Sequence, residues 1–124
     1  MRFSSRQLKK SFSFAFSGLR RVLHEEQNFR LQMTVGLLVI VAMFFFDLSG
    51  LERAILTLAI AFILVLELMN SIFERVADLL KPRVHMHVQE VKDIMAGTVL
   101  LASVAAILVG LLILWPHLAN ELFG

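Results

Sequence analysis

The 124-residue sequence contains no cysteine. This absence excludes a disulfide framework, a thiolate metal site and a cysteine nucleophile. No segment has the pattern G-x-x-x-x-G-K-[ST], and no two glycines form G-x-G. Neither a P-loop nor the glycine loop of a protein kinase is therefore present. We find no glycine- or serine-rich linker, no low-complexity run and no repeat, so we expect residues 1–124 to form a single domain.

Apolar residues are far more abundant than in an ordinary soluble protein. They make up 58% of the chain, against about 45–50% in soluble domains, and the mean hydropathy is +0.78. A soluble domain of this size would leave large apolar patches in water, because a small domain buries only part of its surface. The composition therefore predicts an integral membrane protein.

Three apolar stretches are long enough, or nearly so, to cross a bilayer, which takes about 20 residues. They cover residues 31–46, 54–73 and 94–115. Pro82 should end the second helix near Leu80, with a polar connection before the third. We expect helices over 29–49, 52–80 and 89–118, and thus an all-α fold with three transmembrane helices.

The amino-terminal region is cationic and amphipathic. Seven of the twelve basic residues precede the first apolar stretch, and the first acidic residue is Glu25. An apolar stripe with helical spacing runs through Phe12, Phe16, Leu19 and Leu23. Residues 1–28 therefore predict a helix on an anionic membrane surface, which also makes nucleic acid a poor partner. A mitochondrial transit peptide is an alternative, whereas a cleaved signal peptide fits badly because the apolar core comes too late.

The distribution of basic residues predicts the orientation in the membrane. Apart from the amino-terminal arm, most of them lie in the segment from 74 to 93, and none follows Trp115. Residues 1–30 and 74–93 should therefore be cytoplasmic. The turn at 47–53 and the carboxyl terminus should lie outside.

Glu67 stands inside the second apolar stretch, where a charge is costly, so its default interpretation is functional. At 100° per residue, Glu67, Asn70, Glu74 and Asp78 occupy an arc of about 80° on one helix face. We expect four further polar residues at the starts of the neighbouring helices to reach a similar depth. These are Glu26, Arg30, Lys92 and Asp93.

Such a set suits phosphoryl transfer from a magnesium nucleotide. Magnesium is held by one or two carboxylates together with phosphate oxygens, and catalysis consists mostly of positioning and charge neutralisation. A further carboxylate must accept the proton of the attacking hydroxyl. Glu67 is the candidate because it lies deepest.

Other interpretations of these residues stay open at this point. Glu67 could be a buried acid paired with a basic residue of another helix, and Asn70 an interhelical hydrogen-bonding residue. Glu67 could also be the proton carrier of a small transporter, although a carrier does not need the polar cluster at the cytoplasmic side. A third alternative is a catalytically silent membrane adaptor. A di-iron bundle is disfavoured because histidine follows neither Glu67 nor Glu74 at i+3, and His85 and His87 alone make a weak metal site.

Three segments resemble the small prokaryotic diacylglycerol kinase and undecaprenol kinase family. The string E-L-M-N-S-I-F-E-R-V-A-D at 67–78 is similar to the family's E-[LI]-[LM]-N-[ST]-A-I-E-x-x-[VT]-[VD]. Residues 26–30 resemble its E-x-x-F-[RQ], and residues 92–97 resemble its K-D-x-x-A-G. The similarity covers about residues 9–118 with matching spacing. Ile72 departs from the usual alanine, and Phe14 stands where some members have a tyrosine.

The resemblance implies integral membrane kinases with a surface helix and three transmembrane helices, which act as homotrimers with shared sites. They phosphorylate a lipid hydroxyl with ATP and Mg²⁺. On this basis Glu67 is the general base and Asn70 orients the catalytic site, while Glu26 and Glu74 are metal ligands that also contact ATP. The other residues that it places at ATP are Asp78, His85, Lys92 and Asp93. The family's basic residue near position 7 is Gln7 here, and we expect the nearby Lys10 to contact ATP.

The lipid acceptor is expected to be undecaprenol rather than diacylglycerol, with Glu67 and Arg30 at the lipid. The K-D-x-x-A-G segment and the closing G-L-L-I-L-W-P at 110–116 resemble the undecaprenol kinase branch. The N-S at 70–71 and the F-R at 29–30 also occur in the diacylglycerol branch. The resemblance places the protein in a bacterial cytoplasmic membrane.

Overall fold

The computed structural model describes residues 2–80 and 85–124, with side chains described for 2–80 and 87–124. The described residues form four α-helices and no strand. In chain order the helices are α1 (Ser5–Glu25), α2 (Gln27–Phe45), α3 (Gly50–Leu80) and α4 (His85–Phe123). The all-helical prediction is confirmed.

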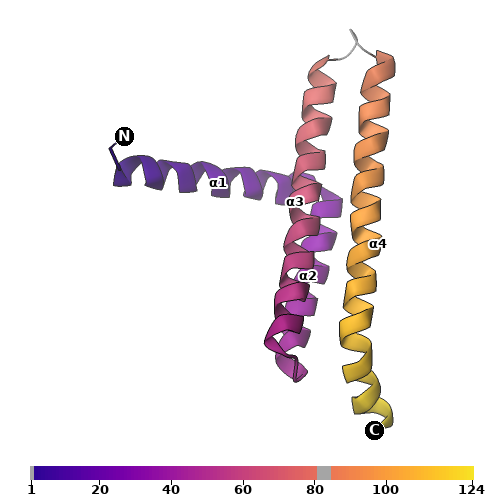
Figure 1. Cartoon of the computed structure of the whole chain (residues 1–124). Helices are drawn as coiled ribbons and strands as arrows, with labels where there is room; N and C mark the ends of the chain where they lie inside the picture. The colour runs from indigo at the N-terminus through magenta and orange to yellow at the C-terminus, as the bar shows by residue number, and fades with distance from the viewer. Residues whose placement is uncertain (1, 81–84) are drawn as a thin grey trace.

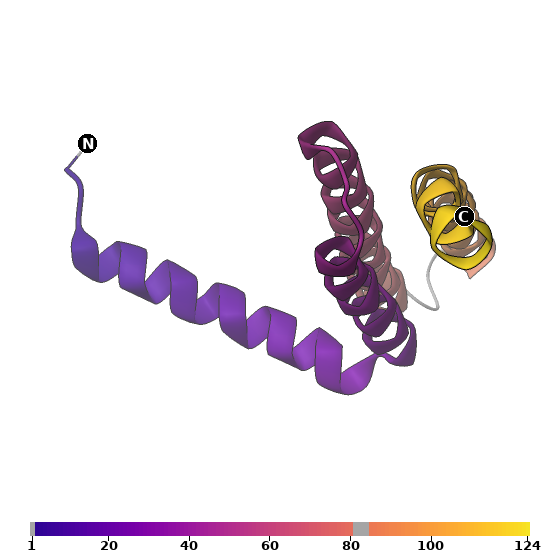
Figure 2. The same ribbon diagram turned by 90° about the horizontal axis from the view of Figure 1, so that it is seen from below.

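Helix α1 extends away from the other three helices and lies across their direction (Figures 1 and 2). The Ser4 side chain caps it by accepting a hydrogen bond from the Gln7 amide at 3.4 Å. None of its residues is buried, and its aromatic side chains, among them Phe12 and Phe16, are exposed. An exposed apolar stripe opposite basic residues is typical of a helix that lies on a membrane surface.

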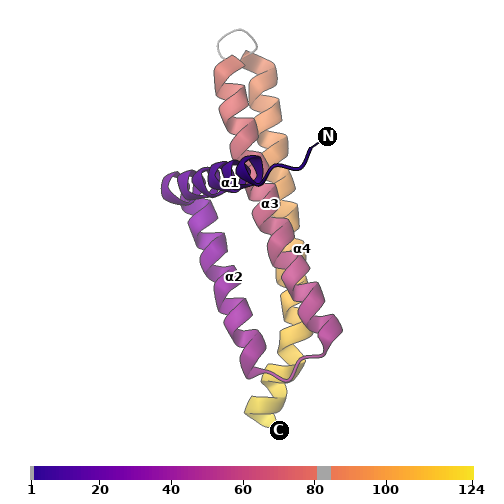
Figure 3. The same cartoon turned by 90° about the vertical axis from the view of Figure 1, so that its left-hand side faces the viewer.

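Helices α2, α3 and α4 are each long and apolar enough to span a membrane. The protein is therefore a multi-pass membrane protein with three transmembrane helices. At 1.5 Å per residue, the 31 residues of α3 and the 39 residues of α4 extend about 46 and 58 Å, well beyond the bilayer core of about 30 Å. Figure 3 shows both helices continuing past the level of α1.

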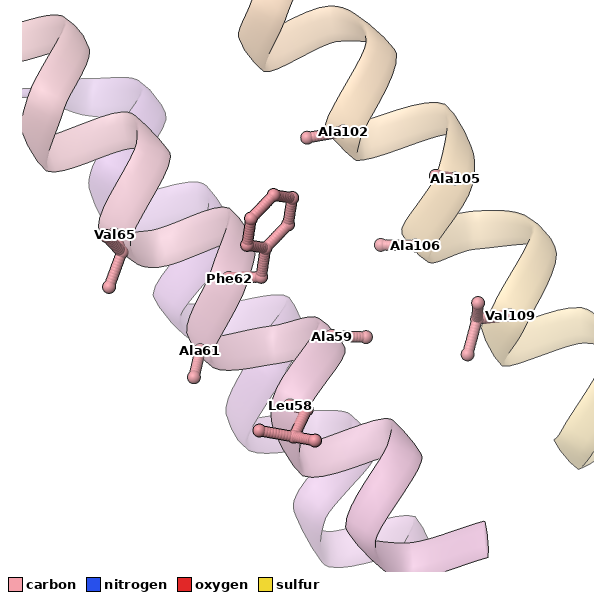
Figure 4. Close-up of a pocket in the computed structure, with 9 residues that line it drawn as sticks. All are labelled: Leu58, Ala59, Ala61, Phe62, Val65, Ala102, Ala105, Ala106 and Val109. Carbon is pink, nitrogen blue, oxygen red and sulfur yellow. The ribbon is translucent and has the colours of Figure 1, made fainter.

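Small residues line a hollow of about 500 Å³ between α3 and α4. Phe62 of α3 points toward Ala102 and Ala106 of α4 across it (Figure 4). Small side chains are typical of faces where transmembrane helices pack. Gly36 has a similar role in α2, because a Cβ atom there would lie 2.9 Å from Cγ2 of Ile60 in α3.

The turn between α2 and α3 is held by the main apolar cluster of the protein. Met43, Leu48 and Leu56 are buried together, and Val109 and Ile113 of α4 pack against them. This cluster joins all three spanning helices at the end of the molecule that lies away from α1.

The bounds of the three transmembrane helices differ by more than two residues from the expected ones in three places. Helix α2 ends at Phe45 rather than at 49, because Ser49 instead caps α3. Helix α4 begins at His85 rather than at 89, and Gln89 donates to Asp93 one turn later, at 2.9 Å, which supports a helical first turn outside the apolar stretch. Helix α4 also continues through Pro116 to Phe123, past the expected end at 118. Helix α3 ends at Leu80, where Pro82 predicts it.

Candidate functional site

A polar pocket lies where the junction between α1 and α2 meets the middle of α3. It has a volume of about 480 Å³. We call it the carboxylate pocket, because four of its eight lining side chains are glutamates. The lining residues are Glu25, Glu26, Gln27, Asn28, Glu67, Asn70, Glu74 and Arg75. The pocket thus brings together Glu26, Glu67, Asn70 and Glu74, as the sequence predicts.

Glu67 forms the floor of the pocket and is only 2% exposed. The Nε2 atom of Gln32, on α2, donates a hydrogen bond to Oε2 of Glu67 at 3.1 Å. This partner was missed from the sequence, although Gln32 is a polar residue inside an apolar stretch, which is a signal of function or of interhelical bonding. The contact ties the two helices together at the depth of the carboxylate.

Glu26 lies in the break between two helices. Its backbone is extended (φ −114°, ψ 115°) and it is both the residue after α1 and the one before α2. The hydroxyl of Ser71 donates to Oε1 of Glu26 at 2.7 Å, and Ser71 is itself 1% exposed. A buried hydroxyl on α3 therefore orients the Glu26 carboxylate toward the pocket.

Two buried acceptor atoms in this region have no hydrogen-bond partner among the described residues. They are Oε1 of Gln32 and Oδ1 of Asn70. Buried polar groups are nearly always paired, and an unpaired one calls for a specific explanation. Acceptors left open beside carboxylates suit a hydroxyl donor or a cation.

The donor set can be tested against a magnesium site. No group of three or more His, Cys, Asp or Glu residues that could hold a metal occurs within residues 2–80 and 87–124. The pocket does supply the carboxylates of Glu26 and Glu74. Mg²⁺ typically binds one or two carboxylates and takes its other ligands from phosphates and water, so these residues fit a metal ion that is bound together with a nucleotide.

Arg75 is the only cationic side chain among the described residues that line the pocket. Its Nη2 atom lies 2.8 Å from Oε2 of Glu25 and 3.9 Å from Oε1 of Glu26. Its Nε atom donates to the Ser71 hydroxyl at 3.4 Å. The guanidinium thus spans the junction between α1 and α2.

A second polar group lies next to the pocket. It consists of Asp78 on α3 and of Gln89, Lys92 and Asp93 on α4. Nζ of Lys92 lies 2.7 Å from Oδ1 of Asp78, and Asp93 accepts from Gln89. None of these side chains lines the carboxylate pocket. Asp78 lies one helical turn beyond Glu74, about 6 Å along α3, so the two groups are neighbours at the same end of the bundle.

Three other predicted site residues lie apart from the carboxylate pocket or outside the described side chains. Nη1 of Arg30 donates to the carbonyl oxygens of Leu23 and His24, at 3.1 and 2.6 Å, so Arg30 caps the carboxyl end of α1. Lys10 is exposed on α1, 15 residues or about 22 Å along the helix from Glu25. The side chain of His85 lies outside the described residues.

An apolar groove is linked to the carboxylate pocket by the hydrogen bond between Gln32 and Glu67. It runs between α2, α3 and α4 and is lined almost entirely by aliphatic side chains, such as Val35, Ile63 and Ile107. Gln32 lines this groove and also contacts Glu67 of the pocket. One amphipathic molecule could therefore place a hydrocarbon chain in the groove and a polar end at Glu67.

Comparison with known proteins points to one family. A family model described as prokaryotic diacylglycerol kinase matches residues 13–114. The chain is 35% identical over 111 residues to a diacylglycerol kinase of Synechocystis, covering 89% of this chain and 63% of that protein. It is 33% identical over 109 residues to the undecaprenol kinase of Bacillus subtilis, covering 88% of this chain and 89% of that protein. It is 27% identical over 108 residues to the diacylglycerol kinase of Escherichia coli, with 87% and 88% covered.

Proposed function

This chain belongs to the prokaryotic diacylglycerol kinase family, and we propose that it is a lipid kinase that transfers the γ-phosphate of ATP to the hydroxyl of a membrane lipid. The observation that carries this proposal is the position of Glu67. It is buried in the carboxylate pocket and is hydrogen-bonded to Gln32, which lines the apolar groove. A lipid hydroxyl and a metal-bound nucleotide can approach each other only at such a boundary.

In the proposed reaction Glu67 accepts the proton of the lipid hydroxyl. The lipid oxygen forms a bond to the γ-phosphorus while the bond to the oxygen that bridges the β and γ phosphates breaks, and ADP leaves. The open Oδ1 atom of Asn70 is available to orient a donor beside Glu67. Gln32 holds the carboxylate by donating from Nε2, as in the structure.

Glu26 and Glu74 would hold Mg²⁺ and also face the ATP. When bound, the ion supplies positive charge to the phosphate oxygens. Ser71 keeps Glu26 turned toward the pocket through its 2.7 Å hydrogen bond. We assign further nucleotide contacts to the second polar group and to the surface helix, through Asp78, His85, Lys92, Asp93 and Lys10.

We propose undecaprenol as the preferred acceptor, with diacylglycerol as the alternative. The resemblances at 92–97 and 110–116 support undecaprenol, and relatives named for each acceptor match this chain. Arg30 would contact the lipid near the membrane surface. It does so from its position as the cap of α1, where its Nη1 atom bonds two carbonyl oxygens.

We further propose a homotrimer in a bacterial cytoplasmic membrane, with the amino terminus in the cytoplasm and the carboxyl terminus outside. The basic residues of α1 and of the segment from 74 to 93 support this orientation. The exposed apolar side chains along α3 and α4 leave area for contacts with lipid or with further copies of the chain.

The test is phosphate transfer from γ-labelled ATP by purified protein in mixed micelles, with undecaprenol and diacylglycerol offered separately. Labelled lipid that disappears in Glu67→Gln and Glu74→Gln supports the kinase, and the preferred acceptor settles the substrate. Glu121→Gln is the matched control, because Glu121 is an exposed carboxylate on the last turns of α4. If folded wild-type protein with Mg²⁺ labels neither lipid, the proposal is wrong.

A further inference from the structure

The carboxylate pocket holds four glutamates and a single arginine among its described lining residues. In the family pattern the glutamate that matches Glu74 is followed by two unspecified residues, the first of which is Arg75 here. The resemblance therefore assigns no role to this positive charge. Neither Lys92 of the second polar group nor Arg30 at the end of α1 lines the pocket. Among the described residues, Arg75 is therefore the cation whose side chain borders a ligand held in the pocket.

We propose that Arg75 exchanges its ion pair with Glu25 for a contact with the γ-phosphate of ATP during transfer. This inference rests on the proposed kinase function. In the structure, the ion pair with Glu25 holds the Arg75 guanidinium at the edge of the pocket.

The geometry places Arg75 within reach of such a phosphate. Its Nη2 atom already lies 3.9 Å from Oε1 of Glu26, one of the two carboxylates proposed to hold the metal. A phosphate that shares this metal would lie next to the same carboxylate. The planar guanidinium donates two parallel hydrogen bonds to phosphate oxygens, which an ammonium group cannot do in the same way.

Breaking the ion pair between Arg75 and Glu25 costs little free energy because both side chains are exposed. The side chains of Arg75 and Glu25 are 45% and 51% exposed, and ion pairs in such positions contribute little to stability. An incoming phosphate carries more negative charge than Glu25. Positive groups aimed at a transferring phosphoryl are among the strongest contributions to this kind of catalysis.

The experiment compares three variants of the full-length protein in micelles: Arg75→Gln, Arg75→Lys and Glu25→Gln. The kinetic arm measures kcat and KM for ATP with the better lipid acceptor. The binding arm measures the affinity for fluorescent ATP and ADP analogues without lipid, and thermal unfolding reports folding of each variant.

Loss of a charge-assisted hydrogen bond should weaken binding of the ATP analogue and lower kcat/KM by about tenfold or more in Arg75→Gln, with little change for the ADP analogue. Arg75→Lys should recover part of the lost affinity and rate, because lysine keeps the positive charge but lacks the planar guanidinium that donates two parallel hydrogen bonds. Glu25→Gln should bind the ATP analogue at least as tightly as the wild type, since Arg75 is released.

A purely structural ion pair would give another pattern. Arg75→Gln and Glu25→Gln would then have the same effects on binding and rate, or none, and either result overturns the inference. If Arg75→Gln does not fold, Arg75→Lys decides, since a variant equal to the wild type in both arms contradicts a role for the guanidinium fork. Failure of the kinase itself is distinguished by the absence of labelled lipid in the wild type, while the binding arm still reports on Arg75.

Discussion

Two regions of the helical bundle, the α2–α3 turn and the carboxylate pocket, each contain a glutamate hydrogen-bonded to a serine, but their hydrogen bonds are satisfied to different degrees. At the α2–α3 turn, Ser49 and Glu52 cap α3 reciprocally: the Ser49 amide donates to Oε1 of Glu52, and the Glu52 amide donates to the Ser49 hydroxyl, both at 3.1 Å. Oε2 of Glu52 lies 3.2 Å from Nε2 of His117. Both carboxylate oxygens thus have partners, and an apolar cluster lies directly beside them.

At the other end, the carboxylate pocket also contains a glutamate bonded to a serine, Glu26 with Ser71. Here, however, the half-buried Gln32 and Asn70 each keep a buried acceptor atom without a partner among the described residues. Open acceptors lower stability unless a ligand satisfies them. The two regions thus share residue types and differ in how far their hydrogen bonds are satisfied.

The sharpest test of this contrast is Glu67→Gln. Removal of a general base should lower kcat for lipid phosphorylation by about 10³-fold. Thermal unfolding should change little, because glutamine keeps the size of the side chain and can still bond Gln32. A variant that unfolds more readily but retains kcat would show that Glu67 is structural.

The opposite result, a loss of stability, is expected for Leu56→Ala in the apolar cluster beside the α2–α3 turn. Leu56 is 2% exposed, and its truncation leaves a cavity that should cost about 2–5 kcal/mol of stability. Unfolding in denaturant measures the loss. Leu58→Ala is the matched control, since Leu58 is 69% exposed and lies on the same helix. Equal losses in both variants would contradict the central role of the cluster.

An intermediate effect is expected for Gln32→Leu. It removes the donor to Glu67 and should lower kcat by about tenfold, the equivalent of one hydrogen bond to a charged group. Asn120→Leu, the same kind of change at an exposed amide on α4, is the control. An unchanged kcat in Gln32→Leu would argue that Gln32 does not position Glu67.

The smallest effect should come from Ser49→Ala. Loss of a helix cap costs about 1 kcal/mol, measured as a lower midpoint of thermal unfolding. The rate of lipid phosphorylation at a temperature well below that midpoint should stay at the wild-type value, because the turn lies at the far end of the bundle from the pocket. A change in KM for ATP would mean that the two ends are coupled.

Much of the fold could be predicted from the sequence. Three apolar stretches of sufficient length, an amphipathic basic segment and a proline after Leu80 specify the helices and their order, since each is a local property of the chain. The alignment of Glu67, Asn70 and Glu74 on one face follows from helix periodicity alone. These residues do line one pocket.

Other parts of the site could not be predicted because they depend on pairing between distant segments. Gln32 and Glu67 are 35 residues apart, and Glu25 and Arg75 are 50 apart. No periodicity links such positions. The contact of the Arg30 guanidinium with the carboxyl end of α1 could not be predicted either, since it depends on the angle between α1 and α2.

Hydropathy and helical periodicity are local properties, so the amino-acid sequence is enough to predict three apolar transmembrane helices with acidic residues on one face of the second. Which polar side chains find hydrogen-bond partners depends instead on how the helices pack. A hydrogen bond between helices requires both partners at the same depth and facing each other, and packing sets that register.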